Sequence, residues 1–310
     1  MMERGNGLGA GYAAYGIYPE HAERWCFHVM YRDDRARGLT EEYLRRHLVV
    51  EHQEPMPTRR VRTLRFVPLL WRYFVSVREE LTELEAEQRI IDCVMEINRH
   101  VEGAFVFSSG RNMGIFKGVG DPDQIAEFYR IPDYRGYIWT AHNRFPTNSV
   151  GWWGGAHPFG ILDWSVVHNG EISSYGINRR YLETFGYWCC LSTDTEVMAY
   201  LFDLLVRRHG LELELVARVL ASPFWSQIER EEDPRRQALL RAIRVIYGSA
   251  LVNGPFAVVV ANSACMLGLN DRIKLRPLVA ATKGHRLYLS LIHISEPTRP
   301  RLISYAVFCL

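Results

Sequence analysis

The sequence predicts an α+β fold, and two observations carry this prediction. Short segments rich in β-branched and aromatic residues occur in neighbouring pairs, and segments with a helical hydrophobic period separate these pairs. No repeat of fixed period is present. Because paired strands that alternate with groups of helices favour antiparallel sheets, we expect α+β layers and not a doubly wound parallel sheet.

The first half of the chain opens with a glycine-rich segment, residues 3–19, whose composition suits a backbone that lies close to another segment. A helix is expected over residues 40–48 with Thr40 as its N-cap, and another over residues 87–101, where apolar side chains recur with a helical period. Residues 110–112 predict a hairpin turn between two strands. The strands expected in this half are Trp25–Tyr31, one or two within residues 61–77, Ala104–Ser108 and residues 113–117.

The second half predicts a similar alternation of strands and helices. Gly186 and Gly210 follow two of the helical segments and are expected to end them. The expected strands are residues 137–141, residues 164–167 and Phe256–Ala261, and the expected helices are residues 178–185, 195–208 and 234–247.

The composition excludes several classes of protein. The 310 residues are 48% hydrophobic and 12% aromatic, which supports a substantial packed core and argues against disorder. A net charge of +2, from 37 basic and 35 acidic residues, gives no sign of a nucleic-acid partner. No apolar run approaches the roughly 20 residues that cross a bilayer. The six cysteines form no zinc-site spacing and are too sparse for a disulfide scaffold, so we expect a reduced, cytoplasmic protein.

The C-terminal tail, residues 289–310, differs from the rest of the chain. LSLIHISEPTR, residues 289–299, and ISYAVFCL, residues 303–310, match the translation of a transposase-type sequencing adapter. We therefore expect this tail to be non-native and the native domain to cover residues 1–288. A natural terminal strand is the alternative interpretation.

Arg144 is a candidate ligand for a carboxylate. Hydrolysis of the side-chain amide of glutamine needs groups that recognise the free α-carboxylate and the α-ammonium, a nucleophile, and donors to the tetrahedral oxyanion. A guanidinium can hold a carboxylate with two parallel N–H bonds, which lysine cannot reproduce. A structural or surface ion pair is the alternative role, and it is the better hypothesis for Arg144 taken alone.

Asp194 could hold the α-ammonium, and the surrounding Thr193 and Glu196 also fit a helix capping box. Asn169 and Gly170 follow the apolar segment WSVV and could direct a side-chain amide and a backbone N–H at one oxyanion. A tight turn is the alternative role of this pair, because Asn-Gly is a strong hairpin signal.

Together with residues 155–159, these candidates resemble the class II glutamine amidotransferases, the N-terminal-nucleophile hydrolase family. Four blocks occur in the order of the family: HNRFPTN, GAHPF, VVHNGEI and TDTEV, within residues 142–197. The longer segment HNGEISSYGINRRYLETFGY and the opening RGNGLGAGYAAYGIYP are most similar to the stand-alone amidotransferase subunit of archaeal-type glutamate synthase. That closer resemblance covers nearly all of residues 1–288.

The resemblance implies a four-layer αββα sandwich with antiparallel sheets and a glutaminase that feeds ammonia to a glutamate synthase catalytic subunit. It gives Arg144 the α-carboxylate of L-glutamine, Asp194 the α-ammonium, and Asn169 with Gly170 the oxyanion. Arg4 would support the pocket less directly. No cofactor or metal is implied for this chain, while FMN and an iron–sulfur cluster would belong to the partner subunit.

The nucleophile of the family is an N-terminal cysteine that uses its own α-amine as the base. This chain begins Met1-Met2-Glu3-Arg4-Gly5, so we expect that about two dozen residues, with the first strand and the nucleophile, are missing. Cys26 lies inside an expected strand, and Cys189 and Cys190 are expected to be buried thiols. The chain as written should therefore be inactive and poorly soluble.

The resemblance assigns no general base to the histidines at positions 142, 157 and 168, which are expected to be hydrogen-bonded structural residues. Two other functions remain open. One is a regulatory subunit that senses glutamine without catalysis. The other is an amidotransferase domain that serves a different acceptor, such as phosphoribosyl pyrophosphate or aspartate.

Overall fold

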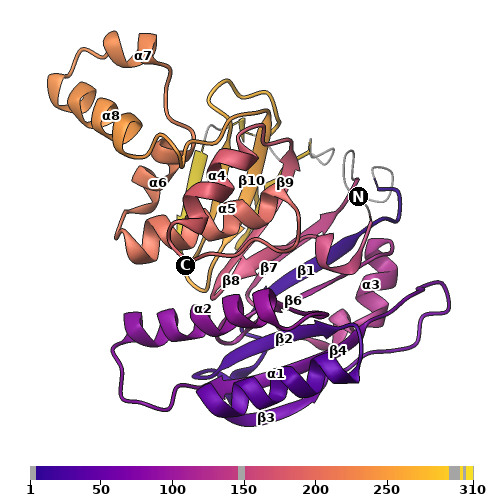
Figure 1. Cartoon of the computed structure of the whole chain (residues 1–310). Coiled ribbons are helices and arrows are strands. Elements are labelled where there is room, and N and C mark those ends of the chain that lie inside the picture. The colour runs from indigo at the N-terminus through magenta and orange to yellow at the C-terminus, as the bar shows by residue number, and fades with distance from the viewer. Residues whose placement is uncertain (1–4, 146–150, 293–300, 303–304, 310) are drawn as a thin grey trace. The chain divides into compact units, whose positions relative to one another are not determined.

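The computed structural model describes residues 5–145, 151–292, 301–302 and 305–309, with side chains for residues 5–145 and 151–292 (Figure 1). The chain forms two compact units. The first comprises Met1–Val167, Tyr187–Ala199 and Ala261–Ser263, and the second comprises His168–Gly186, Tyr200–Val260 and Ala264–Leu310. Helices and antiparallel strand pairs occur in both units, which confirms the predicted α+β fold with antiparallel sheets.

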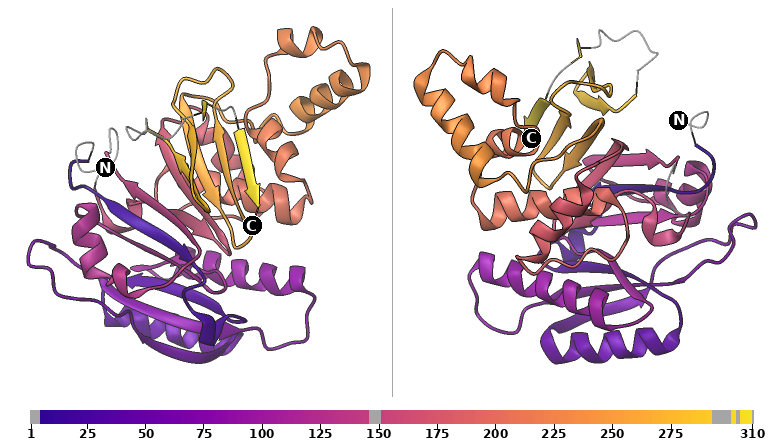
Figure 2. Two further views of the ribbon diagram at one scale, coloured as in Figure 1. Left: turned by 180° about the vertical axis from the view of Figure 1, so that it is seen from behind. Right: turned by 45° about the horizontal axis from the view of Figure 1, so that its top comes forward.

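A four-stranded sheet in the first unit has the strand order β3-β4-β2-β5. Every residue of the inner strand β2 is buried. Helices α1 and α2 pack against each other and on the same face of this sheet (Figures 1 and 2). The bounds are β2 Trp25–Tyr31, β3 Val49–Pro55, β4 Leu69–Ser76, β5 Ala104–Ser108, α1 Asp34–His47 and α2 Glu83–His100.

A three-stranded sheet in the same unit has the order β6-β1-β7, with α3 (Pro122–Phe128) packed on β1 and β6. The strands are β1 Ala10–Tyr15, β6 Met113–Gly118 and β7 Ile138–Asn143. Gly11 in β1 is opposite Lys117 in β6, and a Cβ on Gly11 would overlap the carbonyl oxygen of His157. The glycine-rich opening therefore does allow the close backbone approach that its composition predicts.

The hairpin predicted at residues 110–112 was wrong. β5 pairs with β2, whereas β6 pairs with β1 in the other sheet, so the segment carries the chain from one sheet to the next. Asn112 has a φ of 47°, and its side-chain oxygen accepts the Tyr18 N–H at 2.7 Å while its carbonyl oxygen accepts the Gly16 N–H at 2.7 Å. These contacts with residues distant in sequence decide the direction of the chain, and the local turn signal does not.

The predicted start of α1 at Thr40 was also wrong. The helix begins at Asp34, and the Asp33 carboxylate caps it by accepting the Ala36 N–H at 2.9 Å. Thr40 is buried inside the helix and donates its hydroxyl to the Ala36 carbonyl at 2.9 Å. Helix α2 begins at a capping box formed by Thr82 and Glu85, ahead of the expected start.

Further elements of the first unit are short. Strand β8 (Phe159–Ile161) and the first part of β9 (Trp164–Gly170) form a tight hairpin in which Ile161 is opposite Trp164. Helix α5 (Asp194–Asp203), like β9, runs from the first unit into the second. Single helical turns occur at η2 Pro19–His21, η3 Ile131–Asp133 and η4 Trp153–Gly155.

The second unit combines helices with two groups of antiparallel strands. Gly186 and Gly210 have φ values of 88° and 66° beyond the ends of α4 and of the π-helical turn η5, as predicted. β11 pairs with β15, and β12 pairs with β13 and β14, so part of the tail predicted to be non-native lies in strands. The bounds are α4 Tyr175–Glu183, η5 Leu204–Arg208, α6 Leu213–Leu220, α7 Trp225–Glu229, α8 Pro234–Ile246, β10 Phe256–Ala261, β11 Cys265–Asn270, β12 Val279–Lys283, β13 Arg286–Ser290, β14 Arg301–Leu302 and β15 Tyr305–Cys309.

Candidate functional site

Arg144 lies directly after β7 and is 6% exposed. Its backbone N–H donates to the Gly9 carbonyl at 2.8 Å, which fixes the start of the loop to the glycine-rich segment before β1. The guanidinium packs so closely that a Cβ on Gly155 would lie 3.1 Å from Nη1. Burial lowers the pKa of Arg144, and the carboxylate of Asp194 opposes this shift. The predicted carboxylate clamp is therefore a buried cation with a carboxylate within electrostatic range.

Asp194 is the first residue of α5 and is half-buried. The hydroxyl of Thr195 donates to Asp194 Oδ1 at 3.2 Å, and Thr193 Oγ1 accepts the Thr195 N–H at 3.1 Å. The Glu196 carboxylate accepts the N–H groups of Cys190 and Leu191 at 3.0 and 2.9 Å and so anchors the segment before the helix. A carboxylate at a helix N-terminus is also favoured by the helix dipole. The structure thus places the carboxylate of Asp194 within electrostatic range of the Arg144 guanidinium.

His157 extends this cluster through the hydroxyl of Thr195. Its Nε2 lies 2.8 Å from Thr195 Oγ1, the same hydroxyl that donates to Asp194. The imidazole of His142 contacts that of His157 in a tilted arrangement, with ring centroids 4.2 Å apart and an interplanar angle of 31°. Since His157 is 7% exposed, this contact orders Thr195, and through it the carboxylate of Asp194.

Lys117 is a member of the cluster that the sequence reasoning missed. It is fully buried in β6, and its ammonium donates to the Gly154 carbonyl at 2.9 Å and lies 4.0 Å from the ring centroid of Phe159. Burial lowers the pKa of Lys117 to about 7, and Glu196 opposes the shift. The available signal was a lysine within the otherwise apolar strand sequence MGIFKG.

Asn169 and Gly170 end β9 and belong to the second unit. The side-chain amide of Asn169 donates to the Leu291 carbonyl at 2.9 Å. Gly170 has a φ of 150°, and a Cβ there would overlap the Pro255 carbonyl oxygen. The chain continues from Gly170 toward α4, so the alternative of a two-residue hairpin turn was wrong.

The cysteines and the acidic and histidine side chains can be examined among the described residues. Cys26 and Cys189 are buried and Cys190 is half-buried, and burial raises the pKa of Cys26 and of Cys190 above the ordinary thiol range. Among the described residues, no group of His, Cys, Asp or Glu is arranged to hold a metal ion, and no helix is long and apolar enough to cross a membrane. Arg4 lies outside the described residues.

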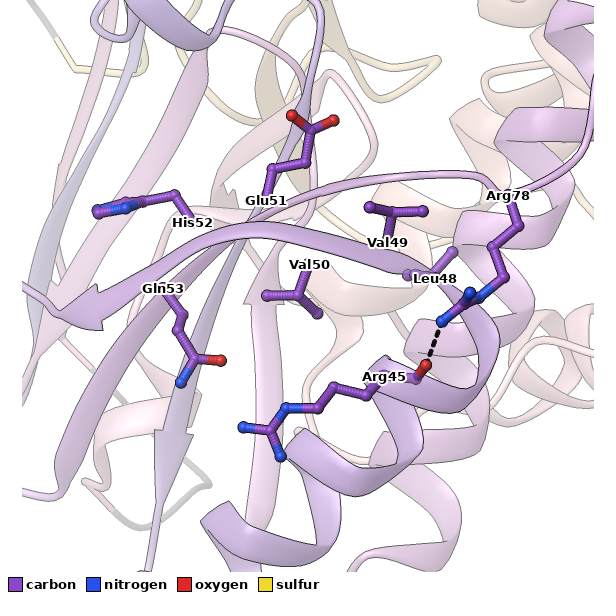
Figure 3. A pocket seen from close by; sticks show the side chains of 8 residues that line it. All are labelled: Arg45, Leu48, Val49, Val50, Glu51, His52, Gln53 and Arg78. Atoms are coloured by element: carbon purple, nitrogen blue, oxygen red, sulfur yellow. Dashed lines mark hydrogen bonds between the residues drawn. The ribbon is translucent and has the colours of Figure 1, made fainter.

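A pocket of about 570 Å³ lies elsewhere in the first unit, along the exposed strand β3 (Figure 3). The guanidinium of Arg78 donates to the Arg45 carbonyl at its rim. None of the predicted site residues lines this pocket, so it is not the glutamine site that the sequence predicts. Its lining consists of Arg45, Leu48, Val49, Val50, Glu51, His52, Gln53 and Arg78.

Comparisons with known proteins support the family resemblance. The family described as glutamine amidotransferases class-II matches residues 55–187, which include Arg144, Asn169 and Gly170 but end before Asp194. A protein from Archaeoglobus fulgidus described as uncharacterized is 50% identical over 295 residues, which cover 94% of this chain and 78% of that protein.

Two further relatives carry functional names. A putative glutamine amidotransferase from Methanothermobacter thermautotrophicus is 31% identical over 46% of this chain and 48% of its own length. A glutamine–fructose-6-phosphate aminotransferase from Vibrio vulnificus is 28% identical over 54% of this chain and 28% of its own length. The chain thus spans about half of one named relative and less of the other. From the family match, we conclude that residues 55–187 of this chain belong to a class II glutamine amidotransferase domain.

Proposed function

We propose that the domain releases ammonia from L-glutamine and supplies it to a glutamate synthase-type partner in the cytoplasm. The observation that carries the proposal is the pairing of a buried guanidinium, Arg144, with the carboxylate of Asp194 in one electrostatic environment. A free amino acid needs such a pair, because its α-carboxylate and α-ammonium carry opposite charges. The partner would carry the FMN and the iron–sulfur cluster.

The proposed roles are those that the family resemblance implies. Arg144 would hold the α-carboxylate, Asp194 would hold the α-ammonium, and Arg4 would support the pocket. Asn169 and Gly170 would donate to the oxyanion once the Asn169 amide exchanges its Leu291 partner for the substrate. This exchange gives the Asn169 amide a new acceptor, while the Leu291 carbonyl loses this donor.

The nucleophile of the proposed reaction is a cysteine thiol with a free α-amine. Its sulfur attacks the side-chain amide carbon, the α-amine transfers the thiol proton to the leaving ammonia, and water then hydrolyses the thioester to give glutamate. No cysteine whose side chain is described meets this requirement, because each lies inside the chain. Burial raises the pKa of Cys93 to about 12, which further lowers its reactivity.

The test is a glutaminase assay on the product of the full reading frame, together with calorimetry. A polypeptide that begins Met-Cys-Gly should bind L-glutamine and release glutamate, and replacing that cysteine with alanine should abolish release while leaving binding intact. Failure of the protein to bind glutamine would contradict the proposed function.

A glutamine sensor without catalysis is the second candidate. The hydrogen bond from Asn169 to Leu291 engages one of the proposed oxyanion donors, although Leu291 belongs to the tail that the sequence predicts to be non-native. Glutamine binding without glutamate release by the full-length product would support the sensor. Activity with ammonia transfer to another acceptor, such as phosphoribosyl pyrophosphate, would instead keep the reaction and change the partner.

A further inference from the structure

We propose that Lys117 is a positioning residue for the glutamine site: its ammonium holds the turn at Trp153–Gly155 against the guanidinium of Arg144. This inference rests on the proposed function, because it assigns the cluster around Arg144 to glutamine. Its evidence lies entirely within the first unit and consists of contacts made by Lys117, by the turn and by Arg144.

The first step is the anchoring of the turn. Lys117 is 0% exposed and donates to the Gly154 carbonyl at 2.9 Å. Gly154 is itself buried, so removal of the ammonium would leave a buried carbonyl without this donor. The lysine stem is held in turn by Gly11, where a Cβ would lie 2.8 Å from Lys117 Cβ.

The second step connects the turn to Arg144. A Cβ on Gly155, the residue after the anchored carbonyl, would lie 3.1 Å from Arg144 Nη1. On the other side, a Cβ on Gly9 would lie 3.3 Å from Arg144 Cδ and 3.2 Å from the Ala156 Cβ. The Arg144 side chain therefore packs against the glycine-rich segment along its stem and against the anchored turn at its guanidinium, and a shift of the turn would change the direction of its N–H groups.

The third step is the charge that surrounds the ammonium. Glu196 on α5 favours the charged form of Lys117, whereas Arg144 after β7 disfavours it. Phe159 at 4.0 Å and Phe107 at 5.9 Å present aromatic rings to the ammonium. An anion bound to Arg144 would offset the repulsion between the two cations and should raise the pKa of Lys117.

The first experiment compares the affinities of Lys117→Met and wild-type protein for L-glutamine and L-glutaminamide, which lacks the α-carboxylate. Loss of positioning should weaken glutamine binding about tenfold and glutaminamide binding much less. Lys283→Met, which removes an exposed lysine of the second unit, is the matched control and should change neither affinity. Equal losses for both ligands, or no loss, would overturn the proposal.

The second experiment uses the wild-type protein and therefore does not depend on whether the variant folds. The sequence contains three lysines, Lys117, Lys274 and Lys283, so ¹³C-lysine labelling gives three Cε signals. Lys274→Arg and Lys283→Arg, at two exposed positions, identify the other two signals and so assign that of Lys117. Saturating glutamine should raise the titration midpoint of the Lys117 signal. A midpoint unchanged by bound glutamine would refute the coupling. Absence of any glutamine binding by the wild-type protein would instead contradict the proposed function.

Discussion

The cluster around Arg144 and the end of β9 differ in what holds their functional groups in place. Arg144, Asp194 and Lys117 are charged groups of the first unit that share one electrostatic environment. Asn169 and Gly170, in the second unit, are defined by backbone contacts with Leu291 and Pro255. The charged candidates could therefore be chosen from residue types, whereas the contacts of the proposed oxyanion donors depend on segments that are remote in sequence.

Substitution of Gly170 with alanine should give the largest effect on stability. The new Cβ would overlap the Pro255 carbonyl oxygen, and the φ of 150° disfavours a side chain, so we expect a loss of roughly 3 kcal/mol or more in unfolding free energy. Chemical denaturation measures this loss. Gly186→Ala is the control, because Gly186 also has positive φ but has open space around its Cβ position. Similar losses for both variants would show that packing at Gly170 is not decisive.

The Arg144→Lys variant tests the cluster around Arg144 through its affinity for L-glutamine. Lysine keeps the charge but loses the two parallel N–H bonds, so the affinity for L-glutamine should fall roughly a hundredfold, or about 2.7 kcal/mol. Calorimetry gives the affinity. Arg130→Lys replaces an arginine of an exposed ion pair with Asp133 and should leave binding unchanged. Wild-type affinity in Arg144→Lys would contradict bidentate recognition.

The pH dependence of the unfolding free energy tests whether Lys117 has a lowered pKa. Its pKa of about 7 in the folded protein lies below the roughly 10.4 of an unfolded lysine. Between these values the unfolded chain binds more protons, so Lys117 should increase the unfolding free energy by up to about 1.4 kcal/mol per pH unit as pH rises. Urea unfolding between these pH values should show that the unfolding free energy of the wild type rises with pH relative to that of Lys117→Met. Parallel pH profiles would mean that Lys117 does not titrate with a lowered pKa.

The Thr195→Val variant should have the smallest effect. It removes the hydroxyl that lies between His157 and Asp194, so the carboxylate loses one donor and its fixed orientation. We expect the affinity for glutamine to fall about tenfold, since one hydrogen bond to a charged group contributes roughly 1.5 kcal/mol. Thr184→Val is the matched control, because its hydroxyl donates to the Tyr181 carbonyl in the second unit. An equal change in both variants would argue against the role of Thr195.

Part of the fold was predictable because some local signals agree with tertiary structure. The bounds of Trp25–Tyr31, Ala104–Ser108 and Phe256–Ala261 follow from runs of β-branched and aromatic residues. Strand β3 was missed, because its sequence VVEHQEP is mostly polar and the strand is largely exposed along one edge of its sheet. The hairpin predicted at residues 110–112 was wrong for a different reason. Strand β6 pairs with β1, which is distant in sequence, and not with the preceding strand β5.

The candidate site was predictable to a similar extent. Arg144 and Asp194 were chosen because their charges suit the two ends of a free amino acid; the structure places them within electrostatic range of each other, and their roles stay predictions. Lys117 could not be assigned from sequence, because one lysine in an apolar strand does not reveal which carbonyl it meets. The engagement of Asn169 by Leu291 depends on a segment far along the chain and has no local signal.

The most direct test of the central claim is an experimental structure of the protein with L-glutamine. The account predicts that the guanidinium of Arg144 contacts the α-carboxylate and that Asp194 contacts the α-ammonium, each at hydrogen-bond distance of about 2.8 Å. Glutamine bound elsewhere, or Arg144 and Asp194 directed to separate parts of the molecule, would contradict it.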